Sequence, residues 1–134
     1  MMLSMFQWIT HLFKPSPDKV EQRLLEMLGF LINDYGFLFS KESLGNLVDD
    51  NGKLVFYGPL NAYQFYNKNL CINILHLVQR DDYNVYITDE KKKDQTYIRS
   101  GTKVPSNLAY DLQAFSRLVK ESVMNQTELF GHKI

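Results

Sequence analysis

The sequence predicts an α+β fold in which an antiparallel β-meander of four to six strands packs against N-terminal and C-terminal helices. Three observations predict it. Apolar residues recur with helical spacing before about residue 36, alternate with a period near two from there to about residue 100, and return to helical spacing after residue 104. Helices that flank a run of strands are typical of an antiparallel sheet with helices on one face. A chain of 134 residues suits a single domain with a hydrophobic core.

Residues 1–14, "MMLSMFQWITHLFK", form an expected N-terminal amphipathic helix. The segment lacks the basic start and small-residue cleavage site of a signal peptide, and it is shorter than the roughly 20 residues that span a bilayer. We expect it to pack on the domain or on a second copy of the chain. The alternative is a helix on a membrane surface, which usually carries several Lys and Arg, whereas only Lys14 is present here.

The single α+β domain is expected over residues 16–124, and its first helix over about 17–33. Ser16 can cap this helix, Pro17 suits the first helical position, and Asp18 suits the positive helix end. Gly36 is available for a left-handed cap after "NDYG". The expected buried stripe consists of Val20, Leu24, Met27, Leu28 and Leu31.

Strands are expected in "FLFS", "LGNLVD", "KLVFYG", "AYQFYNK", "LCINILHLVQ", "YNVYITD" and "TYIRS". Asn51-Gly52 is a strong hairpin signal between the second and third of them. "GPLN" breaks the chain before the fourth strand, and "NKN" and "RDDY" predict the next two turns. These turns join consecutive strands into the meander.

A closing helix is expected in "VPSNLAYDLQAFSRLVKESVM", with Ser106 as its cap. Its apolar stripe is Leu108, Leu112, Phe115, Val119 and Val123, with Leu118 beside it. Residues 125–134 show no period and are expected to be a fraying C-terminal tail.

Charge and cysteine content limit the partners of the protein. Lys plus Arg is 15 and Asp plus Glu is 15, and this balance argues against direct nucleic-acid binding, which needs a positive excess on at least one face. The dense basic run is Lys91-Lys92-Lys93. Cys71 is the single cysteine, so no intramolecular disulfide can form, which fits a reducing compartment.

The sequence shows no constellation for catalysis, and we expect no enzyme, metal or cofactor. His11, His76 and His132 lie in three different kinds of segment, and no cysteine pair exists. The glycines are scattered, so no phosphate loop is present. The alternative is a small-ligand or enzyme domain whose curled sheet encloses a pocket lined by tyrosines, Asn73 and His76.

Acidic doublets lie at or beside the predicted turns, where Asp is favoured for its local hydrogen bonds. Turn chemistry alone would explain them. The functional alternative is a negative patch along the rim of one sheet, which would steer a basic protein partner. The residues of this candidate patch are Asp49, Asp50, Asp81, Asp82, Asp89 and Glu90.

Tyrosines are frequent in the predicted strands and turns. Strand alternation places Tyr86 on the opposite face from Ile72 and Val85, together with Cys71 and Asn73. If that face is uncovered, its composition is typical of a protein-binding surface. The alternatives are that tyrosine simply suits strands, or that the face is enclosed. The candidate anchors are Tyr57, Tyr63, Tyr66, Tyr83 and Tyr86.

Residues 20–123 carry a sequence of three features: a helix containing "LLEMLGFL", a meander with "NLCINILHLVQRDDYNVYI", and a closing helix with "LAYDLQAFSRLV". This arrangement resembles immunity proteins of bacterial contact-dependent and polymorphic toxin systems, with the Arg80-Asp81 turn as its sharpest point. The resemblance implies a cytoplasmic, non-enzymatic protein that binds the catalytic domain of a cognate toxin, often a nuclease, and occludes its active site. A further alternative is a homo-oligomeric assembly module with residues 1–14 as a homodimer seam.

Overall fold

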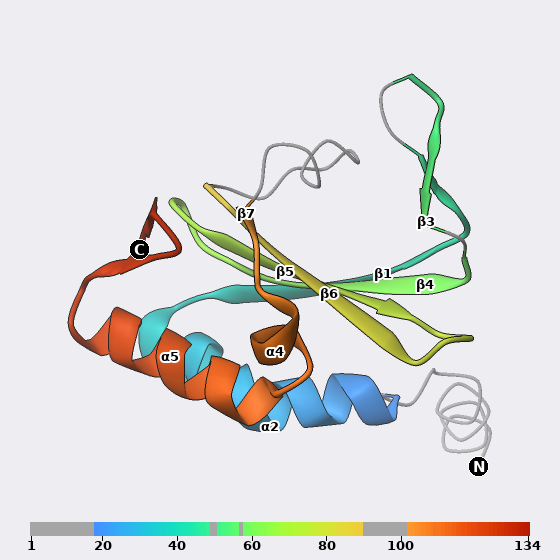
Figure 1. Ribbon diagram of the computed structural model, residues 1–134. Helices are drawn as coiled ribbons and strands as arrows, with labels where there is room; N and C mark the ends of the chain where they lie inside the picture. The colour runs from blue at the N-terminus through green and yellow to red at the C-terminus, as the bar shows by residue number, and fades with distance from the viewer. Residues whose placement is uncertain (1–17, 49–50, 57, 90–101) are drawn as a thin grey trace, which may run out of the picture.

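The computed structural model describes residues 18–48, 51–56, 58–89 and 102–134. Helices α2, α4 and α5 lie on one face of a five-stranded antiparallel sheet, which is the predicted α+β fold (Figure 1). The expected helix over residues 1–14 and the expected strand in "TYIRS" fall outside the described residues. None of the helices in the described ranges is long and apolar enough to cross a membrane.

Helix α2 spans Lys19–Tyr35. Its N-cap is Asp18, whose carboxylate accepts a hydrogen bond from the backbone N–H of Glu21 at 2.6 Å. The residue that caps the helix therefore lies two positions after Ser16, the expected cap. Gly36 adopts the expected left-handed conformation, with φ of 71°, and ends the helix.

The sheet has the strand order β1-β4-β5-β6-β7, and every neighbouring pair is antiparallel. A separate hairpin of β2 and β3 interrupts the meander between β1 and β4. The predicted Asn51-Gly52 turn closes this hairpin, and Gly52 has φ of 78°. The strand bounds are β1 Leu38–Leu44, β2 Leu47–Val48, β3 Leu54–Phe56, β4 Leu60–Tyr66, β5 Cys71–Leu77, β6 Asp82–Thr88 and β7 Thr102–Lys103.

The predicted closing helix is broken into α4 (Ser106–Ala109) and α5 (Leu112–Met124). The predicted cap at Ser106 is wrong, because Ser106 is already helical and the N-cap position holds Pro105, which makes no side-chain cap bond. Asp111 instead caps α5, accepting a hydrogen bond from the N–H of Ala114 at 3.1 Å. A strong capping residue in mid-segment thus starts a second helix.

The C-terminal segment forms a hairpin of β8 (Glu128–Leu129) and β9 (His132–Lys133), so the expected fraying is wrong. Gly131, with φ of 81°, allows the tight turn between the two strands. The side chain of Leu129 is buried in the main core, which holds the hairpin against the domain.

The main core lies between the sheet and the helices. Ile72, Ile74, Val85 and Ile87 face it, as strand alternation predicts. The opposite face of the sheet, called here the second face, carries a smaller apolar cluster of Leu60, Ala62, Leu75 and Tyr86, against which Leu44 and Phe56 pack. Since Phe56 belongs to β3, the inserted hairpin covers part of the second face.

Candidate functional site

The acidic doublets do not form one patch. Asp81 and Asp82 lie at the turn between β5 and β6, whereas Asp89 follows the far end of β6. A strand of seven residues separates these positions by roughly 20 Å at about 3.3 Å per residue. Consecutive turns of a meander lie at opposite ends of the sheet, so the expected common rim is wrong for these residues. Asp49, Asp50 and Glu90 lie outside the described residues.

Each of the three candidate carboxylates that the structure describes lies beside a cationic or imidazole side chain. Asp81 Oδ1 lies 2.7 Å from Nε2 of His76, and Asp82 lies 3.6 Å from the Arg80 guanidinium. The third, Asp89, pairs with the imidazole of His132. The Arg80 charge offsets that of Asp82, and the other two carboxylates are engaged by contacts within the chain.

The candidate tyrosines lie on both faces of the sheet. Tyr63 is fully buried on the helix side, where it pairs across the sheet with Ile74. Tyr86 is only 7% exposed on the second face, and burial raises its pKa. Tyr66 and Tyr83 are half-buried, on the second face and the helix side respectively. Tyr57 lies outside the described residues.

The turn between β5 and β6 stands out from the sheet. We call residues 78–82 the β5–β6 tip. Its exposed side chains include an aliphatic, a cationic and an anionic one: Val78 is 43% exposed, and the side chains of Arg80 and Asp81 are 75% and 80% exposed. Asp81 adopts the left-handed backbone region, with φ of 48°, which brings the chain back into β6.

Behind the tip, the His76 ring stacks on the Tyr83 ring with centroids 4.8 Å apart. His76 is 7% exposed, and its bond to Asp81 ties the stack to the turn. Burial raises the pKa of Tyr83, and the nearby Asp81 charge raises it further. These contacts fix the tip to the end of the sheet.

A polar cluster at the start of α2 was missed from the sequence. The Asp18 carboxylate accepts hydrogen bonds from the Lys41 ammonium at 2.6 Å and the Tyr63 hydroxyl at 2.8 Å, besides its capping bond to Glu21. Burial alone would raise the pKa of Asp18, but these three bonds outweigh burial and lower it. The sequence signal was Asp18 itself, since it is a strong helix cap.

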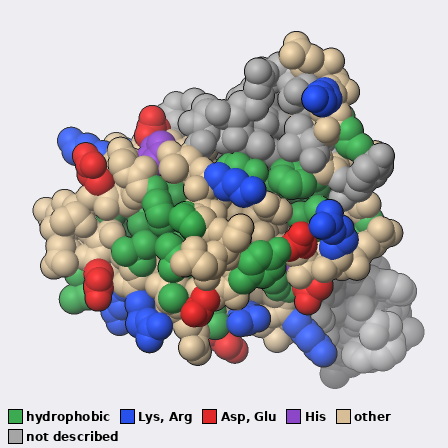
Figure 2. All heavy atoms as spheres, viewed as in Figure 1, with side chains coloured by type: hydrophobic (Ala, Val, Ile, Leu, Met, Phe, Trp, Pro, Cys, Tyr) green, Lys and Arg blue, Asp and Glu red, His purple; other side chains and the backbone are tan. Residues whose placement is uncertain are grey.

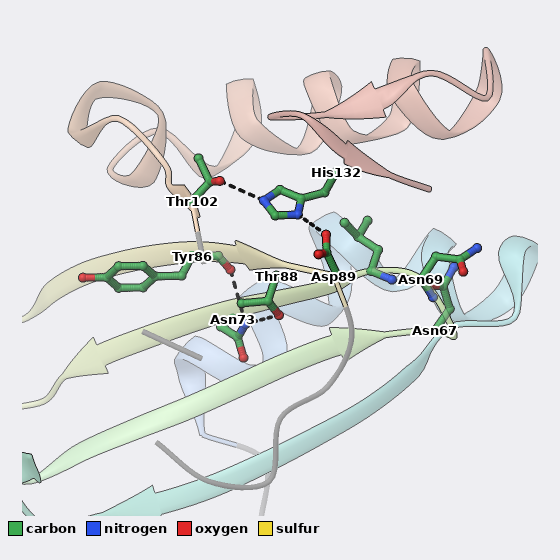
Figure 3. A network of polar contacts seen from close by, with 9 residues as sticks. Asn67, Asn69, Asn73, Tyr86, Thr88, Asp89, Thr102 and His132 are labelled. Carbon is green, nitrogen blue, oxygen red and sulfur yellow. Dashed lines mark hydrogen bonds and ion pairs between the residues drawn. The ribbon is translucent and has the colours of Figure 1, made fainter. Parts of the chain in front are cut away.

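Asn73 and His76 point to opposite faces of β5, so they do not line one pocket as the alternative expected. Asn73 points to the second face, where its Oδ1 accepts from Gln64 Nε2 at 2.6 Å and from the Cys71 thiol at 3.4 Å. Its Nδ2 donates to the carbonyl of Tyr86 and to Thr88, both at 3.4 Å (Figure 3). Every one of these side chains is buried, so the network is part of the interior.

A second network that the sequence did not suggest joins three distant segments. Nε2 of His132, in β9, lies 2.8 Å from the Thr102 hydroxyl in β7, while its Nδ1 pairs with Asp89 after β6 (Figure 3). These contacts attach the C-terminal hairpin to the edge of the sheet. Asp89 is therefore occupied by a contact within the chain.

The described part of the chain holds no group of three metal-ligating side chains. Figure 2 shows Lys, Arg, Asp and Glu side chains intermingled on the face in view, with no large area of one sign. No protein-family model, curated protein or solved structure matches this chain.

Proposed function

We propose that this chain is a non-enzymatic protein-binding module, and more specifically a cytoplasmic immunity protein that occludes the active site of a bacterial toxin domain. The observation that carries the proposal is the β5–β6 tip, which is exposed and is held by contacts of its own. A surface already fixed in its binding conformation loses little conformational entropy when a partner binds.

The composition of the tip suits a protein partner. Arginine is enriched among residues that contribute most to interface energy, and Arg80 is largely exposed. The exposed apolar side chain of Val78 adds area beside it. The Asp81 carboxylate would contribute mainly to the association rate with a basic toxin cleft, because rim charges steer encounter more than they add affinity.

The resemblance to immunity proteins supplies the mechanism of this proposal. A preformed tip that enters the active site or substrate channel of the toxin would exclude the substrate without any reaction on the immunity protein. Such a mechanism needs shape and rigidity at the tip, and it requires no catalytic group, metal or cofactor.

The test first asks whether a large secreted protein with a variable C-terminal domain is encoded directly upstream of this gene, and then uses that C-terminal domain as the toxin. Cells that express this domain should survive only when the full chain is co-expressed, and the purified proteins should form a one-to-one complex. Equal killing with and without the chain would show that the immunity proposal is wrong.

Two variants then test the tip itself. Arg80→Ala should weaken the complex at least tenfold. Asp81→Asn removes the charge while keeping a residue that tolerates left-handed backbone, so it should slow association several-fold at low salt and less at high salt. Glu121→Lys, a charge change on an exposed residue of α5, is the matched control and should leave both constants unchanged.

A further inference from the structure

The Asn51-Gly52 turn of the β2–β3 hairpin has a chemical property that the proposed function does not use. An asparagine carboxamide can react with the backbone nitrogen of the next residue, which makes asparagine one of the chemically less stable residues in proteins. The chain has ten asparagines, and Asn51 alone among them precedes a glycine. Because glycine has no Cβ, its nitrogen approaches the preceding side chain with the least steric hindrance. Within this chain, the reaction should therefore be fastest at Asn51.

The reaction is a ring closure followed by hydrolysis. The backbone nitrogen of Gly52 attacks Cγ of Asn51 and forms a C–N bond, while the bond from Cγ to Nδ2 breaks. The proton of the attacking nitrogen leaves with the amide group as ammonia. Water then opens the resulting succinimide at one of its two carbonyl carbons, which gives either aspartate or isoaspartate. The overall change consumes one water and releases one ammonia, and nothing is oxidised or reduced.

The structure leaves room for this ring at the turn. Asn51 and Gly52 are both exposed, so water reaches both residues. A Cβ placed on Gly52 would lie more than 4 Å from every described atom outside its immediate chain neighbours. In the described part of the chain, no packed side chain therefore opposes movement of the Gly52 nitrogen towards Cγ of Asn51.

The strand pairing beside the turn is short. In the described residues the β2–β3 ladder pairs Leu47 with Phe56 and Val48 with Leu54, and its register shifts between these two pairs. Residues 49–53 connect the last pair and contain the turn. A two-stranded hairpin is marginally stable by itself, and segments with few buried contacts open at a low cost in free energy. The backbone at Asn51 can therefore reach the geometry that ring closure requires.

Other asparagines of the chain provide internal controls for the role of Gly52. Asn73 is buried in the interior network and precedes an isoleucine. Asn69 and Asn125 are exposed, as Asn51 is, but they precede a leucine and a glutamine. The side chains of these following residues hinder the attacking nitrogen, whereas glycine does not. A comparison of Asn51 with Asn69 and Asn125 thus isolates the effect of the glycine at matched exposure.

We propose that Asn51 is a site of spontaneous deamidation, which proceeds through a succinimide formed with Gly52 while the chain is folded. The hairpin turn then accumulates aspartate and isoaspartate at this position. The reaction needs water alone and no partner, so the inference does not depend on the proposed function.

The two products have properties that an experiment can detect. Each replaces a neutral amide with a carboxylate, which adds one negative charge to a chain whose formal net charge is +0. Modified chains should therefore separate from unmodified chains on an anion-exchange column. Isoaspartate also routes the main chain through the former side chain, and it identifies the ring route, because direct hydrolysis of the amide yields aspartate alone.

The test incubates the full folded chain at about 37 °C and about pH 8 in water enriched in oxygen-18, and maps the products by peptide mass spectrometry. Asn51 should take up one labelled oxygen and yield both products, at a rate at least about tenfold above those of Asn69 and Asn125. Gly52→Ala should slow the reaction at Asn51 by a similar factor of about ten. Since Gly52 has φ of 78°, where alanine is strained, circular dichroism checks that this variant is folded.

The comparison with Asn69 and Asn125 uses the parent chain, so it stands even if Gly52→Ala does not fold. The proposal is wrong if Asn51 reacts no faster than these two asparagines, if the product contains no isoaspartate, or if folded Gly52→Ala reacts as fast as the parent. It is also wrong if the folded chain reacts more than about a hundredfold more slowly than the same chain in urea, because the fold would then prevent ring closure.

Discussion

The hydroxyl of Tyr63 donates a hydrogen bond to the carboxylate of Asp18 at 2.8 Å, joining the middle of β4 to the first residue before α2. The same carboxylate caps α2 and pairs with Lys41 of β1 at 2.6 Å. One side chain thus links the start of the helix to two strands of the sheet. It fixes where α2 begins and how its first turn lies over the sheet.

Replacement of Asp18 tests this link. Asp18→Ala should lower the free energy of unfolding by about 2–3 kcal/mol, because loss of a cap costs about 0.5–2 kcal/mol and the buried Tyr63 hydroxyl loses its partner. Asp18→Asn keeps a capping oxygen and should cost about 1 kcal/mol or less. Urea denaturation measures both values. Asp34→Ala, near the negative end of α2, should cost nothing, and an equal loss there would contradict the cap argument.

Part of the loss of stability at acid pH should come from protonation of Asp18. Its pKa is lowered from 3.8 in the folded state, so the unfolded state binds more protons between the two pKa values. The contribution of the carboxylate is therefore complete above its unfolded pKa and is lost as the pH falls below 3.8. The stability difference between the parent chain and Asp18→Asn should shrink between pH 7 and about pH 2.5. A difference that stays constant would show that the charge is not involved.

At alkaline pH, the stability of the protein should depend on the ionisation of its buried tyrosines. Burial, and for Tyr63 the Asp18 bond as well, raises the pKa values of Tyr63, Tyr83 and Tyr86 above 10.0. The unfolded chain then loses these protons first, so stability is complete below pH 10 and falls as the pH rises above it. Tyrosinate absorbance at about pH 11 should report fewer than the eight tyrosines until the chain unfolds. Full ionisation in the native state would contradict the observed burial.

The backbone of the β5–β6 tip can be tested through glycine. Asp81 has φ of 48°, a region that costs most L-residues about 1–2 kcal/mol. Asp81→Ala and Asp81→Gly both lose the bond to His76, but only glycine adopts this conformation freely. The glycine variant should therefore be more stable than the alanine variant by about 1 kcal/mol in urea denaturation. At Gln79, where φ is not positive, the same comparison should show no advantage for glycine.

The secondary structure was largely predictable because it depends on local patterns. Short stretches of sequence predict the helical stripe of α2, the alternation of β5 and the Asn51-Gly52 turn. The face of the sheet on which Ile72 and Ile74 lie followed from alternation alone. The break between α4 and α5 was also visible in Asp111, a strong cap, but a continuous apolar stripe concealed it. The apolar stripe predicted one continuous helix and the capping residue predicted a new helix start, and the structure has the new start.

The candidate sites were less predictable because they depend on which turns share an end of the sheet. Asp81 and Asp89 look alike in sequence, yet β6 places them at opposite ends, and each bonds a histidine that the sequence does not place beside it. The burial of Tyr63 depends on α2 lying over β4, and the spacing of apolar residues does not predict that packing.

Two buried amide side chains on the second face, Gln64 and Asn73, form a hydrogen bond that mutation can test. Gln64 and Asn73 are 6% and 0% exposed and bond to one another at 2.6 Å. Asn73→Leu removes the acceptor of Gln64 Nε2, and an unsatisfied buried donor costs about 1–3 kcal/mol. Gln64→Leu likewise removes a partner of Asn73. In the double variant both partners are apolar, so neither amide is left without the other. Its loss in free energy of unfolding should therefore be smaller than the sum of the two single losses, by at least about 1 kcal/mol. Additive losses in urea denaturation would show that the two amides contribute independently, and the Cys71 and Thr88 contacts of Asn73 would then hold it in place without Gln64.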